Sequence, residues 1–547
     1  MSPVIIGHAP DGARQWHLCI VGSGPVGMAM ALEFDRLGRE VLVLESGGPE
    51  VDPKRSEDSR AVLVNPQTHV PMEIATCRAL GGTSWTWGGR SVPFDDIDLA
   101  DRRWVPHSEW PIDQAELRRW YPKAAEYLLC GNDHFTSAPA HLRGTHPELR
   151  VDALERWATE SRLALVHRAR IEASRHIQLC VNSTVVDLEF NSATRQIEGL
   201  VVAGPNGRSR VRARQIILAM GGVETTRLLL AVQRRLPCLF GGAGGPLGRF
   251  YMGHISGKIA DIVFTRPDSV ADFDFEKDAT GCFTRRRLML SDEAQREHRL
   301  LNLAFWPDNP PFYDYRHRSG VLSGVFLALS FPPTGRRILP EGIRIAHIGP
   351  KPRHYGAHLW NAVVGAPAGA RDVARIVRDR FLSKPRKPGF LVRNAAGKYA
   401  LHYHGEQEPN EESRITLADE ADRFGLPRAA IDLRFTVNDV DSVVRSHRVL
   451  DAALRAVGIA RLEYRYHQEE LADRVRDQAA DGYHQAGTTR MGRDPQSSVV
   501  DSDLRVHGVE NLHIASSSVF PTTGQANSTF PAVALGLRLA HRLHSQG

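Results

Sequence analysis

The sequence predicts an α/β fold, α+β overall, with two domains. The two ends of the chain form one domain, which contains a parallel sheet, and an inserted domain is built on an antiparallel sheet. Three observations predict it. A strand–turn–helix–strand unit lies near the amino terminus, a second glycine-terminated strand ends near residue 220, and a carboxy-terminal strand is followed by a helix with one apolar face.

The amino-terminal unit contains a glycine-rich turn. The apolar run 18–21 leads into Gly-x-Gly-x-x-Gly at Gly22, Gly24 and Gly27, then a helix at 28–37 and a strand at 40–44 that ends at Glu45. The first two glycines let the backbone approach a pyrophosphate, the third permits close helix–sheet packing, and the helix N-terminus offers N–H groups to the phosphates. Glu45 is placed to accept from a ribose 2′-hydroxyl and disfavours a 2′-phosphate. This unit predicts a dinucleotide, NAD or FAD rather than NADP.

Composition and charge exclude several other classes. Of the 547 residues 42% are hydrophobic and 24% charged, as in an ordinary globular protein. The net charge of +6 is scattered, and its tightest run, residues 285–287, is typical of a solvated surface. No apolar run approaches the ~20 residues of a membrane helix. We therefore expect neither nucleic-acid nor membrane partners.

The cysteines and the first residues bear on location. The six cysteines are far apart and several lie inside apolar runs, which favours buried thiols in a reducing compartment. Residues 1–15 contain no basic segment leading into an apolar one. We expect a cytoplasmic protein.

A second glycine-rich stretch, residues 80–90, includes Gly81, Gly82, Trp85 and Trp87. Glycine supplies unusual dihedral angles and tryptophan a stacking surface, so this stretch could pass close to a flat aromatic group. A loop packed on the core is the equally weighted alternative.

The middle of the chain predicts the two sheets. Residues 114–130 are helical in pattern; 177–188 and 196–203 predict strands joined by a turn, and 214–220 a buried strand before a helix at 223–234. Stretches 254–264, 320–331, 343–348 and 391–404 look like strands without long helices between them, which predicts the antiparallel sheet. The charged segment 268–298 is either a lid or a surface excursion. We expect a cofactor-binding domain at 1–95, 175–260 and 476–547, and a substrate-binding domain at 96–174 and 261–475.

The last seventy residues contain the candidate chemistry. His484 lies in a polar, glycine-containing stretch, and a strand at 512–515 precedes Asn527. The apolar-faced helix at 532–544 can be capped by Ser528 or Thr529, and its electropositive N-terminus then lies beside Asn527.

The order of these motifs resembles the glucose-methanol-choline (GMC) oxidoreductase family. The resemblance is based on the first glycine motif with Glu45, the loop at 81–84, the strand end at 219–222, and the pair His484 and Asn527. Within the family, the loop and the His/Asn pair are most similar to pyranose oxidases and bacterial glycoside 3-oxidases. The family's cofactor is FAD. Some pyranose oxidases tether it through a histidine, but Thr86 stands at the matching position here, which implies non-covalent FAD.

The motifs and the resemblance together assign the site. We expect the cofactor to contact residues from both ends of the nucleotide-binding sheet, and we expect no metal. These contacts are Gly22, Gly24, Gly27, Glu45, Gly82, Thr83, Ser84, Val186, Ala219, Gly221, Ser516, Ser528 and Thr529; Ser516 replaces an aspartate of many relatives.

An alcohol oxidised by hydride transfer to flavin N5 must also lose its hydroxyl proton, and histidine accepts a proton near pH 7. We expect His484 to be that base and Asn527 to orient the hydroxyl. The expected substrate is a sugar or glycoside oxidised at a secondary ring hydroxyl, with O₂ or another electron acceptor, and aromatic and polar residues near 305–306, 313–315 and 402–404 would contact it. Oxidation of a non-sugar alcohol and a non-redox hydroxynitrile-lyase activity remain alternatives.

Overall fold

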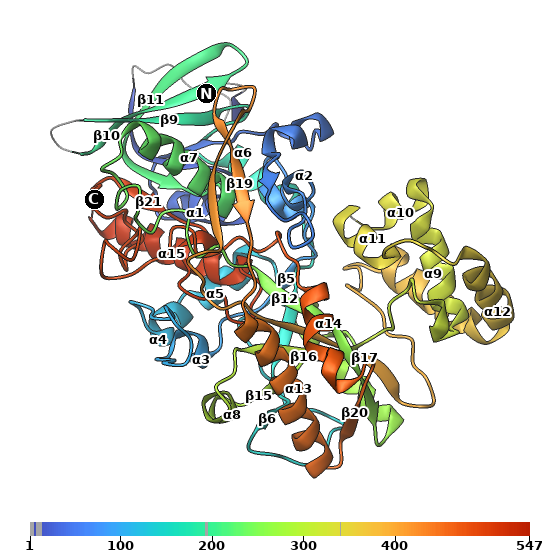
Figure 1. Ribbon diagram of the computed structural model, residues 1–547. Coiled ribbons are helices and arrows are strands. Elements are labelled where there is room, and N and C mark those ends of the chain that lie inside the picture. The colour runs from blue at the N-terminus through green and yellow to red at the C-terminus, as the bar shows by residue number, and fades with distance from the viewer. Residues whose placement is uncertain (1–4, 7–13, 192–194, 340, 547) are drawn as a thin grey trace.

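The computed structural model describes residues 5–6, 14–191, 195–339 and 341–546. Most of the expectation for residues 1–15 lies outside this part of the chain. Figure 1 shows a sheet that holds both ends of the chain, a second sheet below it, and a lobe of helices on one side.

The first sheet has eight strands in the order β1-β8-β3-β2-β11-β10-β9, with β21 beside β11. Its parallel part comprises β1 (Ile5–Ile6), β8 (Ile177–Cys180), β3 (Val41–Leu44), β2 (Gln15–Val21), β11 (Gly207–Leu218) and β21 (Leu512–Ile514). Helices α1 (Pro25–Arg36) and α15 (Thr529–Gln546) pack together, and α7 (Gly222–Arg235) follows β11. The predicted parallel sheet is confirmed, and it also includes β21 from the carboxy-terminal end of the chain.

One strand prediction in this region is wrong. Residues 177–188 form two strands, because Asn182 adopts a left-handed φ of 56° and interrupts the strand. β8 joins the parallel strands, whereas β9 (Thr184–Phe190) pairs antiparallel with β10 (Ile197–Gly204).

The second sheet is antiparallel, as predicted. Its order is β20 (Ala460–Tyr464), β12 (His254–Phe264), β17 (Lys398–Glu406), β16 (Leu303–Asp308), β15 (Leu288–Leu290) and β6 (Leu149–Arg150). Helices α13 (Val437–Ala456) and α14 (Leu471–Gln478) pack against it. β12 extends across residue 260, where we had placed a domain boundary; the domain division stays a prediction.

Two small sheets complete the strands. One contains β13 (Glu276–Lys277), β14 (Phe283–Arg286), β7 (Leu154–Trp157) and β5 (Arg90–Ser91), and the other β18 (Arg414–Ala421), β19 (Pro427–Asp432) and β4 (Val62–Leu63). The segment 268–298, for which a lid and a surface excursion were left as alternatives, is built into the sheets. This segment contributes β13, β14 and β15, and Phe273 and Met289 within it are buried.

The helical lobe corrects two further strand predictions. Residues 320–331 and 343–348 lie in α9 (Gly320–Ser330) and α11 (Glu341–Ile348), which are joined by α10 (Pro332–Ile338) and followed by α12 (Tyr355–Val377). A short apolar run cannot by itself distinguish a buried strand from a buried helix. The Ser319 side chain caps α9 by accepting from the Leu322 N–H, which decides for the helix.

The remaining helices are short. The single helix expected at 114–130 is divided into α4 (Gln114–Arg118) and α5 (Tyr121–Tyr127), and the others are α2 (Met72–Ala75), α3 (Asp96–Leu99), α6 (Leu163–Ala173) and α8 (Asp292–Glu297). None of the helices in the described ranges is long and apolar enough to cross a membrane. All six cysteines are free; Cys77 is partly exposed, and Cys238, contrary to expectation, is exposed.

Candidate active site

A cavity opens at the carboxyl ends of the parallel strands, where an open α/β sheet binds its ligands. Most of the predicted cofactor residues line it: Gly22, Gly24, Glu45, Gly82, Thr83, Ala219, Gly221, Ser516, Ser528 and Thr529, together with His484. Segments from residue 21 to residue 532 thus meet in one place.

The glycines shape the wall by having no side chain. Gly22 has φ = 103°, and a Cβ there would lie 2.5 Å from the Ala219 carbonyl oxygen. A Cβ on Gly82 would lie 2.8 Å from the Gly24 Cα, whereas nothing lies within 4 Å of a Cβ on Gly24. No side chain caps the N-terminus of α1, so its first N–H groups remain open to an anion. The wall fits the pyrophosphate of a dinucleotide.

Glu45 holds the ends of two strands together. Its carboxylate accepts from the Ser23 N–H (2.9 Å), the Ser23 hydroxyl (2.6 Å) and the Gly47 N–H (2.7 Å). Each carboxylate oxygen can accept more than one hydrogen bond, so these contacts leave capacity for a ribose hydroxyl.

Three assigned residues do not line the cavity. Gly27 is behind the wall, where a Cβ would lie 2.0 Å from the Gly22 carbonyl oxygen, in agreement with its packing role. The Ser84 hydroxyl donates to the Gly81 carbonyl (2.7 Å) and is fully buried. Val186 is replaced on the wall by Val185 and Thr184. Ser84 and Val186 therefore do not face this cavity, and their contact with a cofactor stays a prediction.

Several wall residues were missed by the sequence analysis. They include Ser46, Arg78, Thr184, Arg227 and Gln485. Arg78 donates to the Ser46 hydroxyl (2.9 Å) and pairs with Glu224 (2.8 Å). Arg78 lies three residues before Gly81, so its position in the sequence could have indicated a role beside the glycine-rich loop. Arg227 and Gln485 are far from these motifs in the sequence, and only the fold brings them to the cavity.

His484 and Asn527 lie together, as the sequence predicts. Asn527 Nδ2 lies 2.9 Å from His484 Nε2, and His484 Nδ1 lies 2.9 Å from Asp481 Oδ2. These partners suit an imidazole that donates from Nδ1 to the carboxylate and contacts the amide at Nε2.

Asp481, which was not predicted, organises this pair. Its Oδ1 accepts from the N–H groups of Gly482 (2.7 Å), Tyr483 (2.8 Å) and His484 (3.3 Å), and its Oδ2 from that of His254 (2.7 Å). Burial opposes ionisation, but the charge of His484 and these donors hold the pKa of the buried Asp481 carboxyl well below its usual range. The carboxylate fixes the orientation of the His484 ring.

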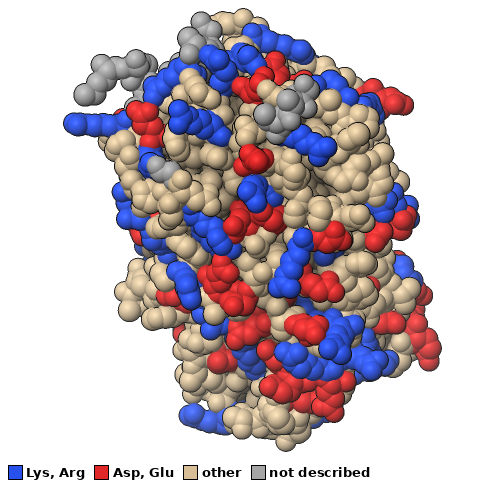
Figure 2. Space-filling model, turned by 90° about the vertical axis from the view of Figure 1, so that its left-hand side faces the viewer, with Lys and Arg blue, Asp and Glu red and all other residues tan. Residues whose placement is uncertain are grey.

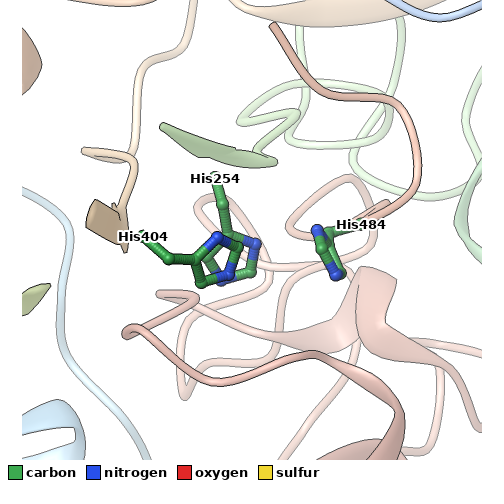
Figure 3. Close-up of side chains that lie close together, drawn as sticks. All are labelled: His254, His404 and His484. Carbon is green, nitrogen blue, oxygen red and sulfur yellow. The ribbon is translucent and has the colours of Figure 1, made fainter. Parts of the chain in front are cut away.

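Two further histidines, His254 and His404, accompany His484 (Figure 3). Ligating nitrogens of the three rings lie within 4.8 Å of one another, which raises the question of a metal. The rings of His254 and His404 are stacked, with centroids 4.4 Å apart and planes 20° from parallel. A metal ion binds about 2.1 Å from nitrogen and in the plane of each imidazole ring. Stacked rings cannot share one ion in this way, so the geometry disfavours a metal at this cluster.

The two additional histidines are neutral at pH 7. Burial, together with the charge of His484, lowers the pKa of His254 to about 4, and burial lowers that of His404 well below its usual value. The Ser256 hydroxyl lies 2.6 Å from His404 Nδ1. Both ring nitrogens of His254 and Nε2 of His404 are buried without a hydrogen-bond partner among the described residues. Each ring can therefore still donate or accept, as a hydroxyl group requires.

Side chains alternate on the strands beside this cluster. Trp306 on β16 stacks on His402 of β17 (4.4 Å between centroids) and lies 6.4 Å from His404. The guanidinium groups of Arg90 and Arg285 each lie 4.6 Å from the Trp306 ring centroid. The intervening residues Phe305 and Tyr403 belong to the core on the other side of the sheet. Tyr313 and Tyr315 lie in the helical lobe and are exposed.

A larger cavity, of about 1960 Å³, lies between the lobe and the sheets. Its wall includes Trp85, Thr86 and Trp87 of the second glycine-rich stretch, Arg285 and Asp308, and a group of aromatic side chains. Those aromatic side chains are Trp157, Phe273, Phe275, Phe312 and Phe390. Asp308 Oδ2 is 4.0 Å from His402 Nδ1, so the wall of the larger cavity comes close to His402, two residues before His404 on β17.

Comparison with known proteins agrees with this geometry. Residues 409–536 match the family model described as GMC oxidoreductase. The chain is 23% identical to a paromamine 6′-oxidase of Streptomyces fradiae, over 97% of this chain and 91% of that protein. It is 30% identical to a fructose dehydrogenase large subunit of Gluconobacter japonicus over 27% of this chain and 26% of that protein. A fungal aryl-alcohol oxidase shares the fold, with a TM-score of 0.53, 15% identity, and 97% and 99% of the two chains covered.

These findings support the GMC oxidoreductase family for this chain. They agree with a Rossmann-type FAD-binding fold and with an oxidoreductase that acts on CH–OH groups, and members of this family bind FAD. The expectation of a pyranose-oxidase or glycoside 3-oxidase branch within the family stays a prediction.

Proposed function

We propose that this chain oxidises a secondary ring hydroxyl of a sugar or glycoside to a keto-sugar, with non-covalent FAD as the hydride acceptor. The observation that carries the proposal is the chain of contacts Asp481–His484–Asn527, at the edge of a cavity that fits a dinucleotide. A base, a residue that orients it and a hydrogen-bond donor are arranged as an alcohol oxidation requires.

His484 accepts the hydroxyl proton. The substrate hydroxyl takes the place of the Asn527 amide at Nε2, the nitrogen that carries the lone pair, and Asp481 stabilises the positive charge that develops on the ring when the proton arrives. The displaced Asn527 amide then donates an N–H to the substrate oxygen and orients its C–H bond.

FAD, when bound, supplies the hydride acceptor at N5 of its ring system. Gly22, Gly24 and the N-terminus of α1 would hold its pyrophosphate and Glu45 its ribose. At the start of α15, Asn527 Oδ1 and Ser528 Oγ are buried without partners among the described residues. These atoms and the positive end of the helix suit the polar edge of a flavin.

The attachment of FAD is tested by acid precipitation. The Thr86 hydroxyl donates to the Thr83 carbonyl (3.1 Å) and cannot form the bond that a tethering histidine forms. We expect one FAD per chain, released into the supernatant by acid. Flavin that stays with the denatured pellet would contradict non-covalent binding.

Three features support a carbohydrate substrate. Unpartnered nitrogens of His254 and His404 can bond additional hydroxyls, and Trp85, Trp87 and Trp157 provide aromatic surface on the wall of the larger cavity. The chain is also similar to proteins named paromamine 6′-oxidase and fructose dehydrogenase. A site built to bond several hydroxyls discriminates strongly against analogues that lack them.

A second candidate is oxidation of a non-sugar alcohol. The wall of the larger cavity includes five Phe and three Trp residues, which favours a substrate with a bulky apolar part. The hydroxynitrile-lyase alternative has no such observation in its favour.

One experiment separates these functions. The holoenzyme is mixed anaerobically with sugars, glycosides, benzyl alcohol and choline, and the loss of flavin absorbance is followed. We expect sugars or glycosides to reduce the flavin with the highest efficiency. Equal reduction by simple alcohols would overturn the carbohydrate assignment, and turnover of a cyanohydrin without bleaching would overturn the redox assignment.

A further inference from the structure

The helical lobe, defined as residues 311–392, differs in charge from the rest of the chain. It contains 14 Lys and Arg against four Asp and Glu, a formal charge of +10, whereas the whole chain carries +6. The remainder therefore carries −4. On the side of the molecule that faces left in Figure 1, away from the lobe, both signs are interspersed (Figure 2). The positive charge of this protein is concentrated in the lobe.

The lobe also exposes apolar side chains. Among the described residues, 20 large hydrophobic side chains are exposed, and 13 of them lie in the lobe. Four of them lie on adjacent turns along one side of α12: Leu359, Trp360, Val363 and Val364, which are 58%, 70%, 64% and 62% exposed. None of the four lines the cavity between the lobe and the sheets.

The opposite side of α12 packs on α9. His358 is fully buried and stacks on Phe326, with ring centroids 4.0 Å apart, and a Cβ on Gly365 would lie 2.8 Å from the Gly320 Cα. On a surface helix of a water-soluble protein the outward side is polar. Here the helix is held by one side while its outward side is apolar, so packing within the lobe leaves this surface uncovered.

Basic residues are grouped at both ends of this apolar surface. Lys351 and Arg353 precede α12, and the basic residues that follow its apolar part are Arg371, Arg375, Arg378, Arg380, Lys384, Arg386 and Lys387. Three of these pair with acids: Arg375 with Asp372, Arg378 with Asp379, and Lys387 with Asp274 outside the lobe. Arg380, Lys384, Arg386 and Lys387 also line the cavity between the lobe and the sheets. The lobe contains too few acids to neutralise the others.

We propose that the lobe binds the surface of a membrane that contains anionic lipids, with α12 lying in the plane of the interface. An exposed tryptophan among aliphatic side chains suits the boundary between headgroups and acyl chains, and flanking Lys and Arg attract anionic headgroups. A second copy of the chain is a poor occupant, because it would bring two surfaces of the same charge together. Although we expected no membrane partner from the sequence, that expectation was based on the absence of a spanning segment.

The experiment uses the full-length holoenzyme and sedimentation with vesicles. One set contains phosphatidylcholine alone, and in the other about a quarter of the lipid is phosphatidylglycerol. We expect sedimentation with the anionic vesicles, little with the neutral ones, and a bound fraction that falls as salt is raised. The double variant Trp360→Asp/Val364→Asp should lower the partition coefficient about tenfold or more.

The matched control is Leu165→Asp/Val64→Asp, which changes two exposed apolar residues outside the lobe (52% and 60% exposed). It should bind like the parent, and both double variants should retain flavin and the parental rate on a soluble substrate. Equal binding by the parent and the lobe variant would overturn the proposal. Two other results would also overturn it: a surface that only joins two copies of the chain, and a surface that binds only a soluble acidic protein. Size-exclusion chromatography with and without vesicles distinguishes both from binding to lipid.

Discussion

The two sides of the candidate active site are built in different ways. The cofactor side is formed by backbone and by missing side chains: Gly22, Gly24 and Gly82 open the space, and a helix terminus faces it. The substrate side is formed by large side chains on β12, β16 and β17, with His254, His404 and Trp306 in contact. The first depends on local backbone conformation and the second on the register between distant strands. Substitutions should therefore affect them differently.

The largest effect is expected from a substitution of His484, which lies between the cofactor side and the substrate side. His484→Ala should slow flavin reduction by about 10²–10⁴-fold, because the proton loses its acceptor. Stopped-flow absorbance measures the rate, and an unchanged flavin spectrum shows that the cofactor side is intact. Reduction at the parental rate would remove His484 from the mechanism.

Asn527→Ala should slow reduction by about 10–10²-fold, since one hydrogen bond to the reacting oxygen is lost. The double variant with His484→Ala should be slowed by less than the product of the two effects, because both residues act on one oxygen. Full multiplicativity would indicate that they act independently.

Gly24→Ala tests the cofactor side alone. Nothing in the protein lies within 4 Å of the added Cβ, so the chain should fold, whereas FAD should bind about 10–10²-fold more weakly if the pyrophosphate occupies that space. Gly244→Ala, another open position, is the control. Equal FAD affinity in both variants, measured by fluorescence titration, would exclude a cofactor contact at Gly24.

Two buried histidines, His402 in β17 and His447 in α13, should lower the stability of the folded protein in acid. Burial lowers the pKa of His447 to about 4 and that of His402 to about 3. Above the unfolded pKa of about 6.5, the neutral buried ring does not lower the free energy of unfolding. As pH falls toward 4, the unfolded state binds a proton that the folded state does not, so the free energy of unfolding decreases, by about 2 kcal/mol per histidine at about pH 5. Asp439, whose pKa burial raises to about 7, acts in the opposite direction.

Thermal unfolding checks this prediction. We expect the melting temperature to fall from about pH 7.5 to about pH 5. The fall should be smaller in His447→Phe, which has no imidazole to protonate. An equal fall in the variant would show that His447 does not contribute.

The smallest effect is expected from the substrate side. His404→Phe keeps an aromatic ring but removes its hydrogen-bonding atoms, and should lower kcat/KM for the preferred sugar by about tenfold. His447→Phe is the control, because His447 contacts Phe305 and Tyr403 on the other face of the same sheet. Equal losses in both variants would show that His404 acts through the fold.

Much of the cofactor side could be predicted because its signals are local. The turn at residues 22–27 needs glycine for steric reasons that involve neighbouring backbone. The apolar face of residues 532–543 predicts α15, although the Ser528 hydroxyl makes no capping hydrogen bond there. Two residues assigned there, Ser84 and Val186, do not line the cavity, because their neighbours Thr83 and Val185 face it instead.

Less of the inserted region could be predicted. α9 was expected to be a strand, since an eleven-residue apolar run buried on several sides has no clear period. Aromatic residues at 305–306 and 402–404 were singled out together, yet strand alternation places Trp306, His402 and His404 near the site and Phe305 and Tyr403 in the core.

The sequence by itself determined the βαβ turn, the carboxy-terminal helix and the identity of His484 and Asn527 as a pair, because each depends on residue type and short spacing. Only the tertiary structure decided that Asp481 orients the base, that two more histidines stack beside it, and that the lobe leaves an apolar surface exposed. These features depend on which strands pair and which faces remain uncovered, and both are set by contacts between residues far apart in the chain.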